Sequence, residues 1–330
     1  MKSLPFIALS IIAALLAFAG LRAVHNSYLF VAGYVVVQFI VLASAWNILG
    51  GYCGYVNFGS AAFFALGAYT SVFFYKLEVV PLPIPALIIV GGIVSGIVGL
   101  GMGYLTLRLR GAFFAIATLA MAVVLQTLIM NWDFVGGSRG AYILHSENVE
   151  VGGFTIAYGE YLFLLMLALA VLAICLSRAI ERSQLGFGFA TIRDDELAAE
   201  ASGVPTLRLK LIATTLSGAL MGMAGAPFPY YIGYLQPASA FDLVYGVNSI
   251  AMPMIGGTTS WIGPLVGALL LGSVQEYARV TISSSVNLLI VGLLLVIFVI
   301  IAPNGLVGLV QERLRARRKT TPRSRASGKP

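Results

Sequence analysis

Charged side chains are scarce in this chain, and their densest interior group lies in residues 177–211, SRAIERSQLGFGFATIRDDELAAEASGVPTLRLKL. The segment contains five acidic and five basic residues. Each would cost about 2.5 to 3.5 kcal/mol at the centre of a bilayer, so the segment must lie in water. Within it, residues 190–202 are predicted to form a short helix, stopped by Gly203 just beyond its C-cap and by Pro205.

The chemistry open to this helix is docking. Its acidic residues lie toward its amino-terminal half, which the helix dipole favours, and its alanines leave a surface with little bulk. A slim, rigid helix that projects from a membrane is suited to a groove in a soluble partner. A solvated connecting loop is the alternative interpretation.

Residues for other chemistry are not grouped. The chain has no Walker A pattern, so it is not expected to bind and hydrolyse ATP. His25 and His145 are far apart and match no metal motif, and Cys53 and Cys175 have no partner spacing. We therefore expect no catalytic residue, no metal and no cofactor, and no enzyme activity. The apolar spans also lack the acidic chains typical of ion coupling, with Glu276 as the one candidate in the last three spans.

The composition is that of an integral membrane protein. Hydrophobic residues make up 59% and charged residues 10% of the chain, against about 45–50% and about 25% in soluble domains. The net charge of +7 does not indicate nucleic-acid binding, because eight of the twenty basic residues lie in the last eighteen positions. Such a tail is typical of the inner side of a membrane, where it meets anionic lipid.

The elements that must position the charged segment are apolar runs long enough to cross a bilayer. We predict an all-α integral membrane protein with ten transmembrane helices, eight or nine being alternatives, in one domain over residues 1–312, followed by a basic cytoplasmic tail, residues 313–330, expected to be disordered. The predicted spans are 4–21, 28–49, 58–74, 84–105, 112–130, 161–176, 211–227, 243–255, 262–277 and 286–301. The first could be a signal peptide, but we favour its retention as a membrane helix.

The distribution of charge predicts the orientation. With the amino terminus inside, inner segments hold sixteen basic and six acidic residues, and outer segments hold four basic and seven acidic residues. This is the bias of the positive-inside rule, so both termini and residues 177–211 are expected in the cytoplasm. Two short runs, 59–71 and 263–273, each follow a glycine-rich break. Interrupted helices in two halves often mark the substrate region of a transporter, although shared use of Gly and Ala explains the likeness as well.

Seven fragments occur in an order that resembles a known family. They are GYVNFGSAAFFALGAYT (54–70), LRLRGAFFAIATLA (107–120), NWDFVGGSRG (131–140), IRDDELAAEASGVPTLRLKLIA (192–213), LSGALMGMAGA (216–226), IGGTTSWIGPLVGALLL (255–271) and APNGLVGL (302–309). The chain resembles the LivM-like permease subunits of high-affinity branched-chain amino acid ABC importers. The resemblance covers residues 30–312.

The resemblance implies a coupling segment that docks on an ATPase. Its residues would be Arg193, Asp194, Asp195, Glu196, Glu200 and Gly203. It also implies a second permease subunit in a heterodimer, two ATP-binding subunits and a periplasmic substrate-binding protein, all at a bacterial inner membrane. The spacing from Glu196 to Gly203 is one residue longer than the E-A-A-x-x-x-G pattern, and Asn57 stands where relatives often carry Ser. Urea, short amides and aromatic acids therefore remain alternative substrates.

Polar residues within or beside the spans are candidates for the translocation path. They are Asn47, Asn57, Ser60, Thr118 and Asn248. The commoner role of such residues is a hydrogen bond between helices. A stand-alone secondary carrier or channel is the alternative function, and it predicts uptake without ATP or partner proteins.

Overall fold

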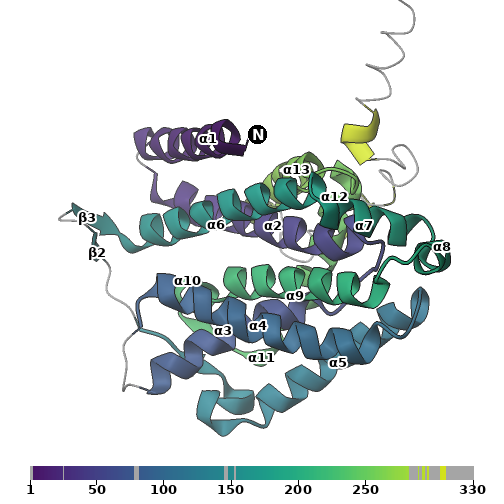
Figure 1. Ribbon diagram of the computed structural model, residues 1–330. Helices are drawn as coiled ribbons and strands as arrows, with labels where there is room; N and C mark the ends of the chain where they lie inside the picture. The colour runs from purple at the N-terminus through teal and green to yellow at the C-terminus, as the bar shows by residue number, and fades with distance from the viewer. Residues whose placement is uncertain are drawn as a thin grey trace, which may run out of the picture.

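The computed structural model describes residues 3–24, 26–77, 82–144, 148–151, 154–281, 289, 292–293, 296 and 305–309. The described chain is mostly α-helical, as predicted (Figure 1). The basic tail, 313–330, lies outside the described residues, and so does most of the tenth predicted span, 286–301.

Six helical stretches of the described chain are long and apolar enough to cross a membrane. They are Pro5–Ala23, Ser27–Tyr52, Ile84–Thr106, Ala112–Met130, Tyr158–Glu181 and Thr206–Ile232. They correspond to helices α1 (Ser3–Ala23), α2 (Ser27–Asn47), α4 (Ile84–Thr106), α5 (Ala112–Met130), α6 (Tyr158–Glu181) and α9 (Thr206–Gly225). Three predicted spans correspond to helices outside this set, α3 (Ser60–Leu77), α12 (Leu243–Gly256) and α13 (Ile262–Thr281). The all-α membrane fold is confirmed, and the count of eight to ten crossings stays a prediction.

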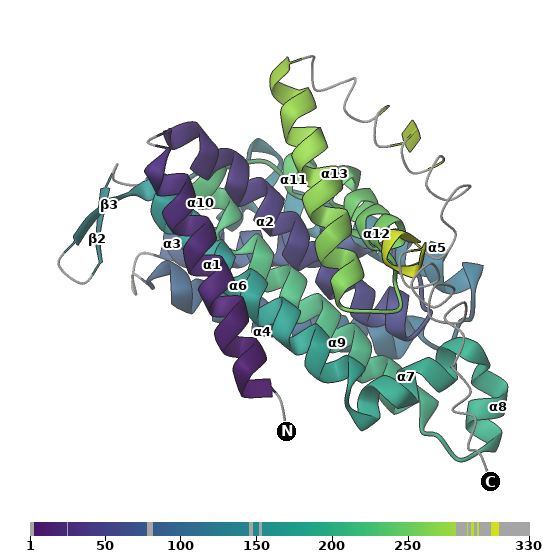
Figure 2. The ribbon, with the colours of Figure 1, turned by 90° about the horizontal axis from the view of Figure 1, so that it is seen from above.

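Short elements gather at one end of the bundle. Strand β1 (Ala141–Tyr142) pairs antiparallel with β4 (Tyr234–Leu235), and β2 (Asn148–Val151) pairs with β3 (Phe154–Ala157). Two 3₁₀ turns (Asp133–Val135 and Gly137–Arg139), α10 (Phe228–Ile232) and α11 (Pro237–Ala240) belong to the same segments. The β2–β3 hairpin lies opposite helices α7 (Gln184–Asp194) and α8 (Glu196–Ala201) in both Figure 1 and Figure 2.

The segments predicted to share the inner side contact one another around α7 and α8. The side chain of Arg110, from the turn after α4, lies 3.7 Å from the carboxylate of Glu196. Trp261, from the turn before α13, donates its backbone N–H to the Glu181 carboxylate at 2.8 Å. The predicted alternation of inner and outer segments therefore agrees with the two ends of the bundle. Which end faces the cytoplasm stays a prediction.

Close helix packing at the centre depends on glycine. A Cβ atom on Gly67 of α3 would lie 1.9 Å from the carbonyl oxygen of Gly222 in α9, and one on Gly222 would lie 2.5 Å from the carbonyl oxygen of Gly91 in α4. Ser95 of α4 donates its hydroxyl to the Phe63 carbonyl of α3 at 2.9 Å. In lipid, small residues of this kind let backbones approach and pack. Helices α3, α4 and α9 therefore form one tight unit.

Both glycine-rich breaks predicted from the sequence are present, and they meet. Helix α2 passes into a π-helix, Ile48–Tyr52, and then into non-helical backbone before α3. Helix α12 ends at Gly256, with Gly257 as its C-cap, and a turn leads into α13. A Cβ atom on Gly51 would lie 2.7 Å from the carbonyl oxygen of Thr258, so the two breaks touch. A π-helix is rare, and here it ends α2.

Helix α1 contacts α6 along its length. Near its start, the Phe6 ring lies edge-on to Trp261 at 4.9 Å, and the Arg178 guanidinium sits 3.6 Å above the Phe6 ring. Further along, Phe18 stacks against Phe163 of α6. The retention of this helix in the membrane stays a prediction, which these contacts favour.

Candidate functional site

The predicted helix over residues 190–202 is wrong in two respects, because it starts earlier, at Gln184, and is broken at Asp195. Helix α7 ends at Asp194, Asp195 has extended backbone (φ −159°, ψ 109°), and α8 starts at Glu196. The Asp195 carboxylate accepts hydrogen bonds from the backbone N–H groups of Leu197 and Ala198 at 2.9 and 3.1 Å. An N-cap of this kind satisfies amide donors that a helix start leaves open, so Asp195 begins a new helix.

The predicted end of the helix is correct. Gly203 follows the C-cap residue Ser202 and has φ +83°, a left-handed conformation that glycine adopts without strain. The N–H of Val204 donates to the carbonyl of Ala199, and that of Gly203 donates to the carbonyl of Glu200. These two bonds form a Schellman motif, which closes α8 after six residues.

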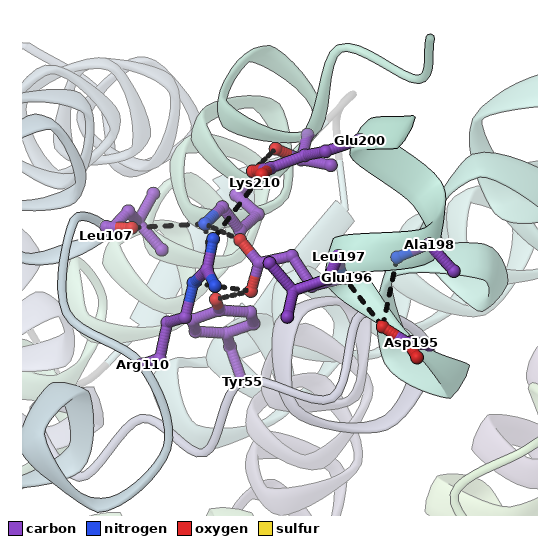
Figure 3. A network of polar contacts seen from close by, with 10 residues as sticks. Tyr55, Leu107, Arg110, Asp195, Glu196, Leu197, Ala198, Glu200 and Lys210 are labelled. Carbon is purple, nitrogen blue, oxygen red and sulfur yellow. Dashed lines mark hydrogen bonds and ion pairs between the residues drawn. The ribbon is translucent and has the colours of Figure 1, made fainter. Parts of the chain in front are cut away.

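Glu196 points inward from α8 to a buried lysine (Figure 3). Its Oε1 atom lies 2.6 Å from Nζ of Lys210, and Tyr55 donates its hydroxyl to the other carboxylate oxygen. Lys210 also donates to the Leu107 carbonyl at 3.1 Å and to the Tyr55 hydroxyl at 3.2 Å. All three ammonium donors are therefore used. The side chain of Lys210 is only 4% exposed and that of Glu196 is 13% exposed.

The position of Lys210 differs from the one predicted from the sequence. The predicted span began at residue 211 and left Lys210 in the water-exposed segment, whereas the structure places it within α9 and buries it. Burial in a sparsely solvated site is tolerated because the charge has a direct carboxylate partner. Tyr55 and Lys210 are functional candidates that the sequence reading missed. The signal in the sequence that could have identified Lys210 was its position at the start of an apolar span, where its charge needs a partner because water is not within reach.

The ionisation of this pair follows from its contacts. Burial by itself raises the pKa of the Glu196 carboxyl, but the hydrogen bonds from Lys210 and Tyr55 and the nearby charges outweigh it, and the net pKa is below the ordinary value. Burial and the adjacent Glu196 carboxylate raise the pKa of the Tyr55 phenol. At neutral pH, Glu196 is ionised and Tyr55 keeps its proton. The arrangement is an ion pair that holds elements together.

A second acidic residue ties α8 to its neighbours more loosely. Glu200 accepts from the Thr206 hydroxyl at 2.8 Å and lies 3.4 Å from Nη2 of Arg110. Arg110 also approaches Glu196 at 3.7 Å and is half exposed. We call the set Tyr55, Arg110, Glu196, Glu200, Thr206 and Lys210 the α8 network. It joins α8 to α9, to the break before α3 and to the turn between α4 and α5.

Arg193 connects α7 to the π-helix. Its guanidinium lies 3.5 Å from the carbonyl oxygen of Gly51 and 3.3 Å from the carboxylate of the exposed Asp194. A Cβ atom on Gly54, which has φ +80°, would lie 2.9 Å from Cγ of Arg193. The backbone of the break therefore packs directly under Arg193, so α7 is also fixed against the membrane helices.

Three of the five predicted path residues meet at the break before α3. Asn57 accepts from the backbone N–H of Gly59 through its side chain, and its carbonyl accepts from the Trp46 indole and the Ser60 hydroxyl at 2.8 to 3.1 Å. Thr118 of α5 accepts from the backbone N–H of Phe58 at 3.2 Å. These bonds fix the start of α3.

Of the other two path candidates, one borders the same break and one lies in α12. Asn47 is fully buried at the end of α2, with its carboxamide oxygen against Gly51. Asn248 of α12 accepts from the Gln275 side chain of α13 at 2.8 Å. Asn47 therefore borders the break, whereas Asn248 lies where α12 and α13 meet. A role for any of the five in the path stays a prediction.

Comparison of the sequence with known proteins identifies a family. The sequence model described as branched-chain amino acid transport system, permease component, matches residues 27–299. The chain belongs to this family. It is a membrane permease of branched-chain amino acid transport, and the match includes the charged segment, both breaks and the α8 network.

Individual relatives agree with the family. The chain is 29% identical over 303 residues to the high-affinity branched-chain amino acid transport system permease protein LivM of Salmonella typhimurium, and 28% identical to LivM of Escherichia coli, in each case over 84% of this chain and 69% of the relative. It is 24% identical to a probable branched-chain amino acid transport permease protein LivH of Methanocaldococcus jannaschii, over 78% of this chain and 85% of the relative. No solved structure matches the chain.

Proposed function

We propose that this permease is one transmembrane subunit of an ABC importer in a bacterial inner membrane. It translocates branched-chain amino acids, or a related small polar solute, delivered by a periplasmic binding protein. It pairs with a second permease, and two ATP-binding subunits drive it. The family match and the absence of a Walker A pattern from the sequence support this division of labour.

The observation that carries the proposal is the surface of α7 and α8. Phe187 is 68% exposed and Leu197 is 63% exposed, in a segment whose charges place it in water. Of the acidic residues predicted to dock, Glu196 instead faces inward, and Asp195 caps α8. We therefore assign Phe187, Asp194 and Leu197 to contact with the ATP-binding subunit. Glu196, Glu200 and Gly203 shape and anchor the segment that presents them.

The α8 network connects this docking surface to the membrane helices. Lys210 lies in the first turns of α9, Tyr55 lies in the break before α3, and Arg110 lies in the turn before α5. An ATP-binding subunit can shift the permease between two states only if it binds the states with different affinity. A displacement of α8 would be passed to three membrane segments, because the network joins it to all three.

The proposal is tested by charge substitution on the exposed surface. We expect Leu197→Glu and Phe187→Glu to reduce co-purification of the ATP-binding subunit and ATP-dependent leucine uptake. Leu144→Glu is the matched control, because Leu144 is exposed at the opposite end of the bundle. If both surface variants retain the subunit and transport as the control does, the docking assignment is wrong. Uptake by the purified chain alone, without ATP, would instead favour a stand-alone carrier.

A further inference from the structure

A cavity of about 400 Å³ lies beside the α8 network. Its apolar wall is formed by Tyr55, Val56, Phe58, Ala112 and Ala115, and its charged residues are Arg110 and Glu196. The size lies within the range of small-molecule sites, and so does the composition, which is mainly apolar with a few convergent polar groups. The break before α3, the first turn of α5 and the start of α8 line it.

The charges of this cavity are not equally available. Both carboxylate oxygens of Glu196 are engaged, one by Lys210 and one by Tyr55. The contacts of Arg110 with Glu200 and Glu196 measure 3.4 and 3.7 Å, against about 2.7–2.9 Å for a strong charge-assisted hydrogen bond. The guanidinium has five N–H donors, and its side chain is 49% exposed. The charge open to a ligand is therefore positive.

We propose that this cavity binds the carboxylate of a small solute with an apolar body, at the end of the permease where α7 and α8 dock. Its identification as the transported branched-chain amino acid rests on the proposed function. The carboxylate pairs with Arg110, which matches it in fork geometry, and the aliphatic side chain lies against Val56, Phe58 and Ala115. Arg110 then turns from Glu196 and Glu200 toward the ligand. Binding of the ligand therefore weakens the contacts of Arg110 that help to hold α8 in place. Accumulated solute would thus act on the coupling segment.

Cysteine protection in the assembled complex tests occupancy at this site. Ala112 lines the cavity and is exposed, so Ala112→Cys is introduced together with Cys175→Ser, the remaining Cys53 being buried. We expect leucine, at ten times its Kd, to slow labelling by a water-soluble maleimide about tenfold by mass action. Leucinamide, which lacks the carboxylate, should give no protection. Leu109→Cys is the matched control, because Leu109 is exposed three residues away and does not line the cavity.

Two variants link protection to the cavity. Arg110→Gln should abolish protection by leucine, whereas Arg110→Lys should retain part of it. Ala115→Leu, which adds bulk to the apolar wall of the cavity and leaves the α8 network intact, should weaken it. The proposal is overturned if leucine gives no protection, if leucinamide protects equally, or if the ATP-binding subunits alone shield the thiol introduced by Ala112→Cys. ATP-driven uptake is measured on the same complexes, so a transporting complex without protection overturns this inference and leaves the proposed function standing.

Discussion

Replacement of Glu196 by glutamine tests whether the buried ion pair holds the coupling segment. The substitution keeps the shape of the side chain and removes its charge. The ammonium of Lys210, 4% exposed, then loses its carboxylate counter-charge and keeps only neutral acceptors, among them the Leu107 carbonyl and the Tyr55 hydroxyl. Removal of one member of a buried pair costs about 3–5 kcal/mol, because the other charge stays buried without compensation.

The cost should appear in α8 itself. A helix of six residues has little stability of its own, so its order depends on the network and its caps. If the free energy of local opening falls by about 3 kcal/mol, the amide hydrogens of α8 should exchange roughly a hundredfold faster, at about 1.36 kcal/mol for each factor of ten. The reporting amides are those of Ala199, Ser202 and Val204, which bond within the α8 turn.

Hydrogen exchange read by mass spectrometry on the assembled complex is the assay, with ATP-dependent uptake measured in parallel. Glu196→Gln combined with Lys210→Met removes both charges and should restore most of the protection. Glu200→Gln should change exchange little, because its ion pair with Arg110 is largely exposed and worth about 1 kcal/mol or less. Unchanged exchange in Glu196→Gln, or faster exchange in the double variant than in the single one, would refute the reasoning.

Three further outcomes are expected. The pKa of Glu196 is lowered in the folded protein, so the ionised side chain should stabilise α8 fully above the ordinary carboxyl pKa of about 4.3. This stabilisation should be lost as the pH falls through the lower pKa of the folded state. The rate of proteolysis within α8, measured against pH, tests this, and Glu196→Gln should remove the pH dependence. Gly67→Ala should destabilise the protein by about 1–3 kcal/mol, because its Cβ would meet backbone of α9, while Gly101→Ala, which meets nothing within 4 Å, should not; thermal unfolding in detergent compares them. Gly203→Ala should destabilise α8 by about 1–2 kcal/mol, because alanine is strained in the left-handed conformation of this position. Hydrogen exchange at the Val204 amide should become faster. An increase no larger than that caused by Gly159→Ala, whose Cβ meets nothing within 4 Å, would contradict this expectation.

Much of the fold follows from local properties that the sequence displays. The apolar runs identified the six helices that can span a membrane, because hydropathy over about twenty residues is a property of each run alone. The two glycine-rich breaks and the end of α8 at Gly203 were also predicted, since the conformations that these glycines adopt are set within a few residues.

The site required the tertiary structure. From the sequence, Glu196 and Leu197 are neighbours in one polar segment, and nothing local shows that the acid turns inward while the leucine faces water. The break at Asp195 sets the direction in which the side chains of α8 point, and the contacts of Glu196 with its partners fix it. Tyr55 is 141 residues from Glu196, and Arg110 is 90 residues from Glu200. Contacts of that separation depend on how α3, α4 and α9 pack. The sequence by itself therefore determined which segment must leave the membrane, and the packing of the helices decided which of its residues anchor it and which are left for a partner.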